Sequence, residues 1–381
     1  MLAAVEAGKG VAFAVDRARL ADAADLVAKT TAAAYPDGLV PPHSRWRHFE
    51  TPGGRDMWAE AADAHDWTNA ADRARAEIDL AFVSVFLDAG AGSAWRYQAK
   101  DGRSIGRSEG LAAASLDMFL AGAFSGDPDR PWQADATGIA RLDADALMRG
   151  LQSGPWAAEP GADVIGLDGR LELLANLAAA LDRAPDLFGP PPGRPGGVYD
   201  WALKEGADAG GLLTALADRL APIWPDGTTI RDRPCGDVWP LANAPEGYAP
   251  FHKLTQWLVY SLTEPFARAG RPLGGVERLT GLAEYRNGGL FADLGVIRPL
   301  DPTAAAALHQ PGDPFVVEWR AVTVALLDDL LPLVRDALGA PGFTLAQMLQ
   351  GGAWSAGRAL AAERRPGAAP PFRVASRGAL F

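Results

Sequence analysis

The residues best suited to chemistry gather in the segment 279–296, which reads LTGLAEYRNGGLFADLGV. Glu284 is followed at once by Tyr285, Arg286 and Asn287, and apolar residues flank the group on both sides. A carboxylate among apolar neighbours is hard to ionise unless it is paired, which suits general acid–base catalysis or stabilisation of a cation. We therefore predict that Glu284 is catalytic and that the three residues after it contact the substrate.

Two further acids stand in similar surroundings. Asp237 lies in GDVWP, and Glu318 lies in VEWRAV with Arg320 two residues later. Each acid could assist Glu284, and Arg320 could bind the substrate. The alternative for every one of these acids is a salt bridge or a helix cap, because ion pairs also perturb buried carboxylates. We favour the structural alternative for Asp237 and the catalytic role for Glu284.

Lys253 opens an aromatic-rich stretch, PFHKLTQWLVY. A lysine in the first turn of a helix opposes the helix dipole, so we expect it to answer a carboxylate or a bound anion. Gln256 and Trp257 follow at helical spacing on the same face and are predicted substrate contacts. The alternative is a surface lysine whose aliphatic stem covers apolar neighbours.

A basic loop, VPPHSRWRHFE, precedes these segments in the chain. Its candidate ligand-binding residues are His43, Arg45, Trp46, Arg47 and His48. Arginine can bind the oxygens of phosphate or carboxylate with two parallel hydrogen bonds, so the loop could hold an anionic group. The alternative is a loop attached to the body of the protein by arginine–acid bridges and by its aromatic residues.

Neither a metal nor a cofactor is predicted. The chain has a single cysteine, Cys235, and no Cys/His cluster with zinc spacing. The patterns GxxxxGK[ST], HExxH and GxSxG do not occur, and GxG at residues 90–92 does not extend to a dinucleotide motif.

Composition limits the classes of partner. The 381 residues carry a net charge of −11, which disfavours nucleic acid and anionic membrane surfaces. No apolar run reaches the ~18 residues of a membrane span, and the N-terminus lacks the pattern of a signal peptide. We expect a cytoplasmic protein that binds a small molecule, and self-association is left open.

Apolar periodicity predicts a mainly α chain with at most a small β-sheet. The predicted helices span 16–34, 69–89, 109–121, 168–182, 211–224, 251–263 and 318–338. Pro265 is expected to end the sixth of these helices. Short strands are predicted at 228–230 and within 288–296.

A single domain over residues 1–381 is predicted, because Ala- and Leu-rich helical character runs through the whole chain. The segment 189–197, GPPPGRPGG, is interpreted as a surface loop within that domain and not as an interdomain linker. Residues 359–381 are expected to form an extended tail.

The chain resembles the uracil-catabolism protein family of the non-reductive uracil degradation route. The resemblance extends over nearly the whole chain and is carried by VPPHSRWRHFE, FLDAGAGSAWRY, GRSEGLAAASLDMF, GDVWPLA, PFHKLTQWLVYSLTEP, GLAEYRNGGLFADLGV, VEWRAVTVALLDDL and GGAWSAGRALAAE. It implies a role in a route that opens the uracil ring, passes through a ribosylurea species and yields urea.

A weaker resemblance is to the queuosine-salvage nucleotide N-glycosylases, which are helical and akin to helix-hairpin-helix DNA glycosylases. It implies that their catalytic lysine and aspartate fall on Lys253 and Glu284, and that Arg286, Glu318 and Arg320 fall on shared positions. The glutamate in place of aspartate lengthens the arm by one methylene. The implied fold is that of these glycosylases, and their aromatic pocket for a large base has no counterpart in this sequence.

Together, the two resemblances imply hydrolysis of the N-ribosyl bond of ribosylurea or its 5′-phosphate. An oxocarbenium-like transition state needs a nearby carboxylate, and the attacking water needs a base; Glu284 could supply both. Glu318 or Asp237 would then protonate the leaving urea, and the basic loop would hold a 5′-phosphate. The alternatives are an amidohydrolase acting on a ureido intermediate and a non-enzymatic binding partner of the ring-opening enzyme.

Overall fold

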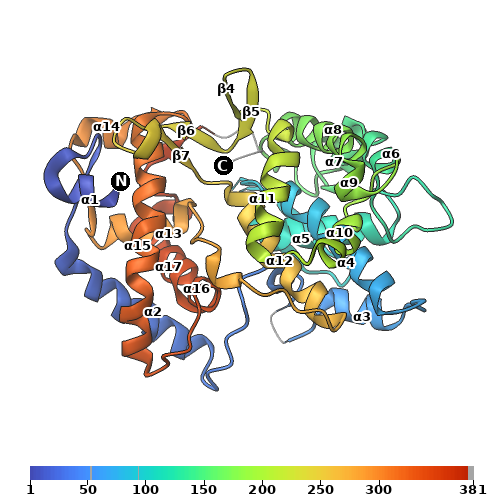
Figure 1. Ribbon diagram of the computed structural model, residues 1–381, viewed down its shortest axis with the longest axis horizontal. Helices are drawn as coiled ribbons and strands as arrows, with labels where there is room; N and C mark the ends of the chain where they lie inside the picture. The colour runs from blue at the N-terminus through green and yellow to red at the C-terminus, as the bar shows by residue number, and fades with distance from the viewer. Residues whose placement is uncertain (52–53, 93, 376–381) are drawn as a thin grey trace. The chain divides into compact units, whose positions relative to one another are not determined.

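Helices carry most of the chain, as the apolar periodicity predicts. The computed structural model describes residues 1–51, 54–92 and 94–375. Within those residues the strands form two-stranded pairs and no larger sheet (Figure 1). The predicted mainly α class is therefore confirmed, and the β-structure consists of separate pairs in place of one small sheet.

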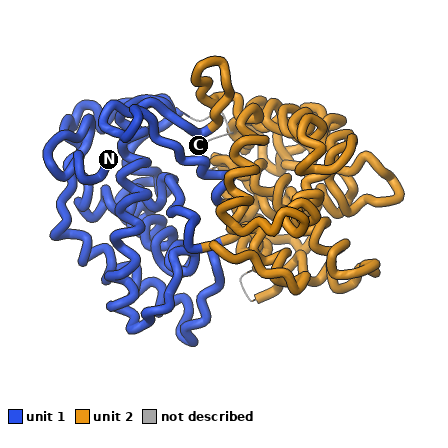
Figure 2. Tube along the Cα trace, in the orientation of Figure 1, with its two compact units in different colours: residues 1–43, 237–256, 277–375 blue, residues 44–236, 257–276, 376–381 orange. Residues whose placement is uncertain are grey.

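The described residues divide into two compact units, coloured separately in Figure 2. Unit 1 contains Met1–His43, Asp237–Gln256 and Glu277–Ala375, and unit 2 contains Ser44–Gly236 and Trp257–Val276. One boundary falls inside the basic loop and another inside α12 (Lys253–Arg268). That the two units act as a single domain stays a prediction.

Unit 1 is built around long and short helices and three strand pairs. Its helices are α1 (Leu2–Ala4), α2 (Leu20–Ala34), α13 (Tyr285–Asp293), α14 (Pro302–Ala306), α15 (Pro314–Leu338), α16 (Leu345–Met348), α17 (Trp354–Arg364) and the first turn of α12. Its antiparallel pairs are β1 (Phe13–Val15) with β8 (Ile297–Pro299) and β6 (Val238–Pro240) with β7 (Tyr248–Pro250). Its parallel pair is β9 (Leu308–His309) with β10 (Arg373–Val374).

The core of unit 1 forms where α15 packs on α2 and α13 packs on α17. One stripe of α15 is fully buried, including Val316, Val322 and Leu326. Close packing of α13 on α17 requires Gly357, because a Cβ at that position would clash with the carbonyl oxygen of Arg286.

Unit 2 is also helical. Its helices are α3 (Met57–Asp63), α4 (Ala70–Leu87), α5 (Arg107–Leu120), α6 (Ala136–Ala140), α7 (Ala144–Gly150), α8 (Leu167–Arg183), α9 (Pro185–Phe188), α10 (Gly197–Glu205), α11 (Ala209–Arg219) and the remainder of α12. Its antiparallel strand pairs are β2 (Arg96–Gln98) with β3 (Ser104–Gly106) and β4 (Thr228–Ile230) with β5 (Arg233–Gly236). The second half of α4 is buried on all sides, which identifies it as the central helix of this unit.

The strand predicted within 288–296 is wrong, because α13 occupies that segment as far as Asp293. Its two glycines are tolerated by packing: a Cβ at Gly288 would lie 2.5 Å from Nε1 of Trp319. The strand predicted at 228–230 is present as β4.

Pro265 does not end α12, which continues to Arg268. A proline has no N–H to donate to the carbonyl four residues before it, here that of Ser261. In the structure that carbonyl accepts a hydrogen bond of 2.7 Å from Nε1 of Trp46 instead. The side chain therefore satisfies the group that proline leaves unpaired, and the helix can pass through.

The structure also places the two segments that were expected to be irregular. The 189–197 segment lies wholly in unit 2, where Gly196 N donates to Asp79 at 2.7 Å, so it does not link the two units. The tail expected from residue 359 begins later, because α17 continues to Arg364 and β10 forms beyond it. Residues 376–381 of that tail lie outside the described residues. Nowhere in the described ranges is a helix both long and apolar enough to cross a membrane.

Glu318 holds the N-terminal segment onto α15. Its buried carboxylate accepts hydrogen bonds from the backbone N–H groups of Val11, Ala12 and Phe13 at 2.8, 2.6 and 2.9 Å. Nδ2 of Asn243 donates a fourth at 2.6 Å. Residues more than 300 positions apart in the chain are thus joined by one side chain.

Replacing Glu318 by alanine should destabilise the protein by about 3 kcal/mol, because one buried and three partly buried donors would lose their acceptor. Urea denaturation measures the change, and limited proteolysis should show faster cleavage within residues 1–16. Glu60→Ala is the matched control, since its carboxylate is exposed and pairs only with exposed Arg55. Equal midpoints for Glu318→Ala and Glu60→Ala would contradict the anchoring role.

Candidate functional site

Glu284 is the residue that begins α13. Its backbone is extended, and its two carboxylate oxygens accept hydrogen bonds from the N–H groups of Arg286 at 2.6 Å and Asn287 at 2.5 Å. The residue as a whole is half-buried. The helix-cap alternative is thus present in the structure, but a carboxylate has about four acceptor sites and the cap uses two of them. The cap therefore orients the carboxylate of Glu284 and leaves part of its hydrogen-bond acceptor capacity unused.

Burial dominates the ionisation of Glu284. It raises the pKa of this carboxyl group above its ordinary value, against the opposing effect of the two backbone hydrogen bonds. The positive charges of Lys253 and Arg286 also lower this pKa. Lys253 therefore acts on Glu284 electrostatically, which agrees with the expectation that this lysine answers a carboxylate.

Asp237 and Arg320 form a buried ion pair in the same unit. The guanidinium donates to both carboxylate oxygens at 2.7 Å, and the two side chains are 1% and 2% exposed. Burial alone would raise the pKa of Asp237, but the charge and hydrogen bonds of Arg320 outweigh it and hold that pKa well below its usual range. Asp237 is consequently an ionised structural partner, as the favoured alternative had it.

This ion pair joins the segments that carry Lys253 and Glu284. Oδ2 of Asp237 accepts the backbone N–H of Lys253 at 3.0 Å, where α12 begins. Nε of Arg320 donates to the carbonyl of Ala283 at 3.2 Å, one residue before Glu284. The pair therefore fixes the starts of both helices from one point.

Apolar packing encloses the ion pair. The guanidinium of Arg320 lies 4.0 Å from the centre of the Phe251 ring, and Phe251 packs in a buried cluster with Ala283 and Val317. Low polarity around the pair strengthens its attraction and raises the cost of breaking it.

The remaining predicted contacts in unit 1 serve mainly to hold the site together. Nη1 of Arg286 donates to the carbonyl of Ala368 at 2.7 Å, and Nδ2 of Asn287 donates to that of Leu282 at 3.2 Å. Tyr285 is partly accessible and lies beside Arg286, whose guanidinium is 4.6 Å from its ring centre. Of these three residues, Tyr285 is partly exposed, whereas Arg286 and Asn287 are buried.

Gln256 connects α12 to the segment that precedes Glu284. Its Nε2 donates to Oγ1 of Thr280 at 2.8 Å, and its Oε1 accepts the backbone N–H of the same residue at 3.3 Å. Both ends of the amide are therefore used within the protein.

The basic loop divides between the two units. His43 belongs to unit 1, where its Nδ1 lies 3.0 Å from Oε1 of Gln350. In unit 2, Arg45 is fully buried and donates to Asp88 at 2.8 Å, while Arg47 donates to Glu264 at 2.7 Å. These are the arginine–acid bridges of the alternative interpretation.

Aromatic residues complete the attachment of the loop within unit 2. Trp46 is buried and donates its indole N–H to α12, as described above. His48 meets Trp257 edge to face with ring centres 5.6 Å apart, and the guanidinium of Arg45 lies 5.6 Å from the centre of the Trp257 ring. The contacts of Arg45, Trp46, Arg47, His48 and Trp257 that the structure gives are thus internal to unit 2.

His252 is a candidate that the sequence interpretation missed. It directly precedes Lys253, has φ of +45°, which is unusual for a residue with a side chain, and is partly buried. Burial lowers the pKa of its imidazole, against the effect of Asp237, so the ring is neutral at neutral pH. The order Phe-His-Lys was visible in the sequence, but the backbone strain that distinguishes the histidine was not.

Arg320→Met should cost about 3–5 kcal/mol at neutral pH, because it leaves Asp237 buried without a partner. In the native protein the pKa of Asp237 is lower in the folded state than in the unfolded state. Its contribution to the free energy of unfolding is therefore present above about pH 4 and is lost as the pH falls further. In the variant the desolvated carboxyl group favours its protonated form, so acidification should restore stability. Urea denaturation at several pH values measures both effects.

Arg149→Met is the matched control for that series, because Arg149 and Asp145 form an exposed pair on one helix. It should change stability by about 0.5 kcal/mol or less. A comparable loss in both variants, or an unchanged pH slope in Arg320→Met, would contradict the assigned role of the buried pair.

Comparison with known proteins places the chain in a family. All of it, residues 1–381, matches the family described as "Protein of unknown function (DUF1688)". Protein urg3 of Schizosaccharomyces pombe (strain 972 / ATCC 24843) is 37% identical over 383 residues, which cover 97% of this chain and 92% of the relative. Uracil catabolism protein 4 of Lachancea kluyveri is 35% identical over 418 residues, which cover 98% and 93%. The resemblance to uracil-catabolism proteins is confirmed, and the chain belongs to the DUF1688 family.

Proposed function

We propose that this protein acts in uracil catabolism by hydrolysing the N-ribosyl bond of ribosylurea or its 5′-phosphate to urea and ribose or ribose phosphate. The names of the two relatives support the pathway. The observation that carries the reaction is Glu284, a half-buried residue whose carboxyl group has a raised pKa, accepts two backbone N–H groups and lies under the charge of Lys253.

In the proposed reaction Glu284 takes a proton from water while the water oxygen bonds to C1′ of the ribose. The C1′–N bond breaks with its electron pair going to nitrogen, which takes a proton from solvent to give urea. Positive charge that develops on the ribose in the transition state is stabilised by the nearby carboxylate. The backbone hydrogen bonds fix the direction of that carboxylate, and directional fixing lowers the cost of reaching the reactive geometry.

Asp237 and Glu318 take positioning roles in this proposal. Both are buried, and the oxygens of each carboxylate are occupied by hydrogen bonds from several donors, so the proposal gives neither a direct part in the reaction. The positive charge of Lys253 lowers the pKa of Glu284 and so favours its ionised form, against the effect of burial. Tyr285 is the proposed substrate contact beside it.

Incubation of the purified protein with synthetic ribosylurea and with its 5′-phosphate tests the proposal directly. We expect release of urea and a reducing sugar from at least one of them. Release of ammonia would indicate the amidohydrolase alternative. Absence of turnover with both substrates would reject the hydrolase and favour a non-enzymatic role.

Glu284→Gln should reduce turnover by about 10²–10⁴-fold, because the amide cannot accept the proton of water. Its loss of stability should stay near 1 kcal/mol, the usual cost of weakening a helix cap. Asp56→Asn is the matched control: Asp56 caps α3 by accepting the N–H groups of Trp58 and Ala59, both at 3.0 Å. This variant should keep full activity, and a Glu284→Gln enzyme that retained its rate would exclude Glu284 as the base.

The pH profile tests the role of Lys253. Because the base must be ionised, kcat/KM should fall as the pH drops through a pKa above the ordinary glutamate value of 4.5. Lys253→Met removes a charge that lowers this pKa, so the acid limb should move to higher pH. An acid limb that stays in place in Lys253→Met would show that the lysine does not tune Glu284.

A further inference from the structure

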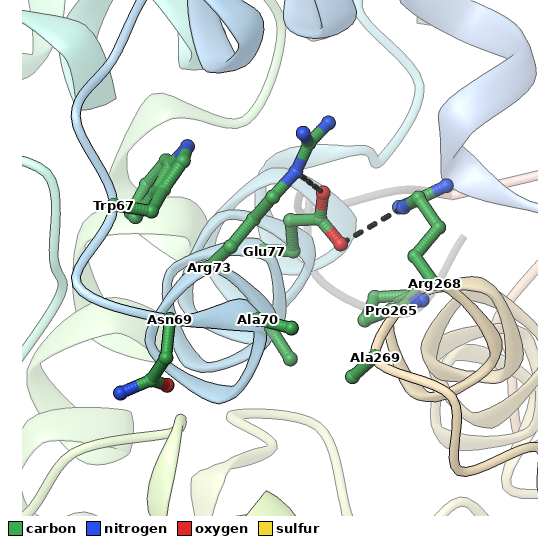
Figure 3. Close-up of a pocket in the computed structure, with 9 residues that line it drawn as sticks. Trp67, Asn69, Ala70, Arg73, Glu77, Pro265, Arg268 and Ala269 are labelled. Atoms are coloured by element: carbon green, nitrogen blue, oxygen red, sulfur yellow. Dashed lines mark hydrogen bonds and ion pairs between the residues drawn. The ribbon is translucent and has the colours of Figure 1, made fainter.

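A cavity of about 480 Å³ lies in unit 2, between the start of α4 and the end of α12. Figure 3 shows its lining, in which two arginine side chains reach one glutamate from opposite sides. The lining includes Trp67, Ala70, Arg73, Glu77, Pro265 and Arg268. None of them belongs to the predicted catalytic or substrate-binding residues.

Glu77 holds the guanidinium groups of Arg73 and Arg268, each through its Nε–H. Its fully buried carboxylate accepts Nε of Arg73 at 3.0 Å on one oxygen and Nε of Arg268 at 2.9 Å on the other. The indole N–H of Trp58 donates to it as well, at 3.0 Å. With each guanidinium held through Nε, the terminal nitrogens are the groups left to meet a ligand.

The terminal nitrogens are only partly used. Nη1 of Arg73 donates to the exposed Asp63 at 2.9 Å, and Nη1 of Arg268 makes a long bond of 3.3 Å to Glu264. Among the described residues, Nη2 of neither arginine has a hydrogen-bond acceptor. The two side chains are 26% and 34% exposed, so solutes can reach them.

Charge and shape define the class of ligand. Two guanidinium groups and one carboxylate are among the lining residues, which gives the lining one net positive charge; Asp63 and Glu264, outside the lining, each accept from one terminal nitrogen. Guanidinium groups fit the planar or tetrahedral oxygens of carboxylate and phosphate. Trp67 and Pro265 supply an apolar wall, and the volume falls in the range of small-molecule sites.

We propose that this cavity is a second ligand site, which binds a small organic oxyanion through the terminal nitrogens of Arg73 and Arg268. The ligand carries one phosphate or carboxylate group and a flat apolar body that lies against Trp67. The site is separate from the reaction assigned to Glu284 and does not depend on it.

Isothermal titration calorimetry on the full chain tests the site without any activity measurement. Phenyl phosphate, benzoate and inorganic phosphate are the probes. We expect binding of phenyl phosphate or benzoate, with the tighter one identifying the headgroup, and weaker binding of inorganic phosphate, which lacks the apolar body. No heat of binding from all three probes would overturn the proposal.

Arg73→Gln and Arg268→Gln should each lower the affinity for the tighter-binding probe about tenfold or more, because each removes charged hydrogen bonds to the headgroup. Arg75→Gln is the matched control. Arg75 lies on the same helix with 30% of its side chain exposed and pairs with Asp200 outside the cavity. Its substitution should leave the affinity within about twofold, and an equal loss in all three variants would overturn the site.

Removing either arginine also takes a partner from buried Glu77, so a variant that keeps the charges is needed. Ala70→Trp fills the cavity from the first residue of α4 and leaves both arginines in place. It should abolish binding of phenyl phosphate or benzoate while the circular dichroism spectrum stays native. Unchanged affinity in Ala70→Trp would overturn the proposal even if the arginine variants did not fold.

Discussion

The buried pair of Asp237 and Arg320 is the interaction on which the candidate site depends. A charge removed from water is tolerated only when its partner and its hydrogen bonds are in place. Few arrangements of the surrounding groups meet that condition for a buried pair. Here that geometry includes the backbone N–H of Lys253 and the carbonyl of Ala283. The first turn of α12 and the start of α13 are therefore set together, and this pair fixes the backbone from which Glu284 projects.

Unit 2 uses the same physical device around its central helix. α4 is buried on all sides along its second half, yet it carries Glu77 and Asp79, both fully buried. Asp79 accepts from Arg194 and from the backbone N–H groups of Ala134 and Gly196, which attaches the Pro- and Gly-rich segment to the helix. Glu77 accepts the Nε–H groups of Arg73 and Arg268 and does not bind their terminal nitrogens. Asp79 thus attaches a loop to the helix, and Glu77 fixes two arginines that line the cavity.

Local patterns predicted much of this architecture because helix formation depends on residues three and four apart. The long helix over 318–338 and the central helix over 69–89 appear close to their expected positions, as α15 and α4. The errors came where a distant side chain overrides a local rule. Trp46 supplies the hydrogen bond that lets α12 pass through Pro265, and packing against Trp319 accommodates the glycines of α13.

The sequence by itself determined the mainly α class, the family, and the group of acids and bases from which any site must be chosen, because these follow from local periodicity and from residue types in order. Only the tertiary structure decided which acid stays accessible. Glu318 is occupied by backbone donors 305 or more positions away, and Asp237 by an arginine 83 positions away, and no local pattern records such partners. Among the described residues the carboxylate of Glu284 accepts hydrogen bonds from the helix it begins, and these use two of its about four acceptor sites. A carboxylate's role is set by the donors that converge on it, and that convergence is a property of the fold.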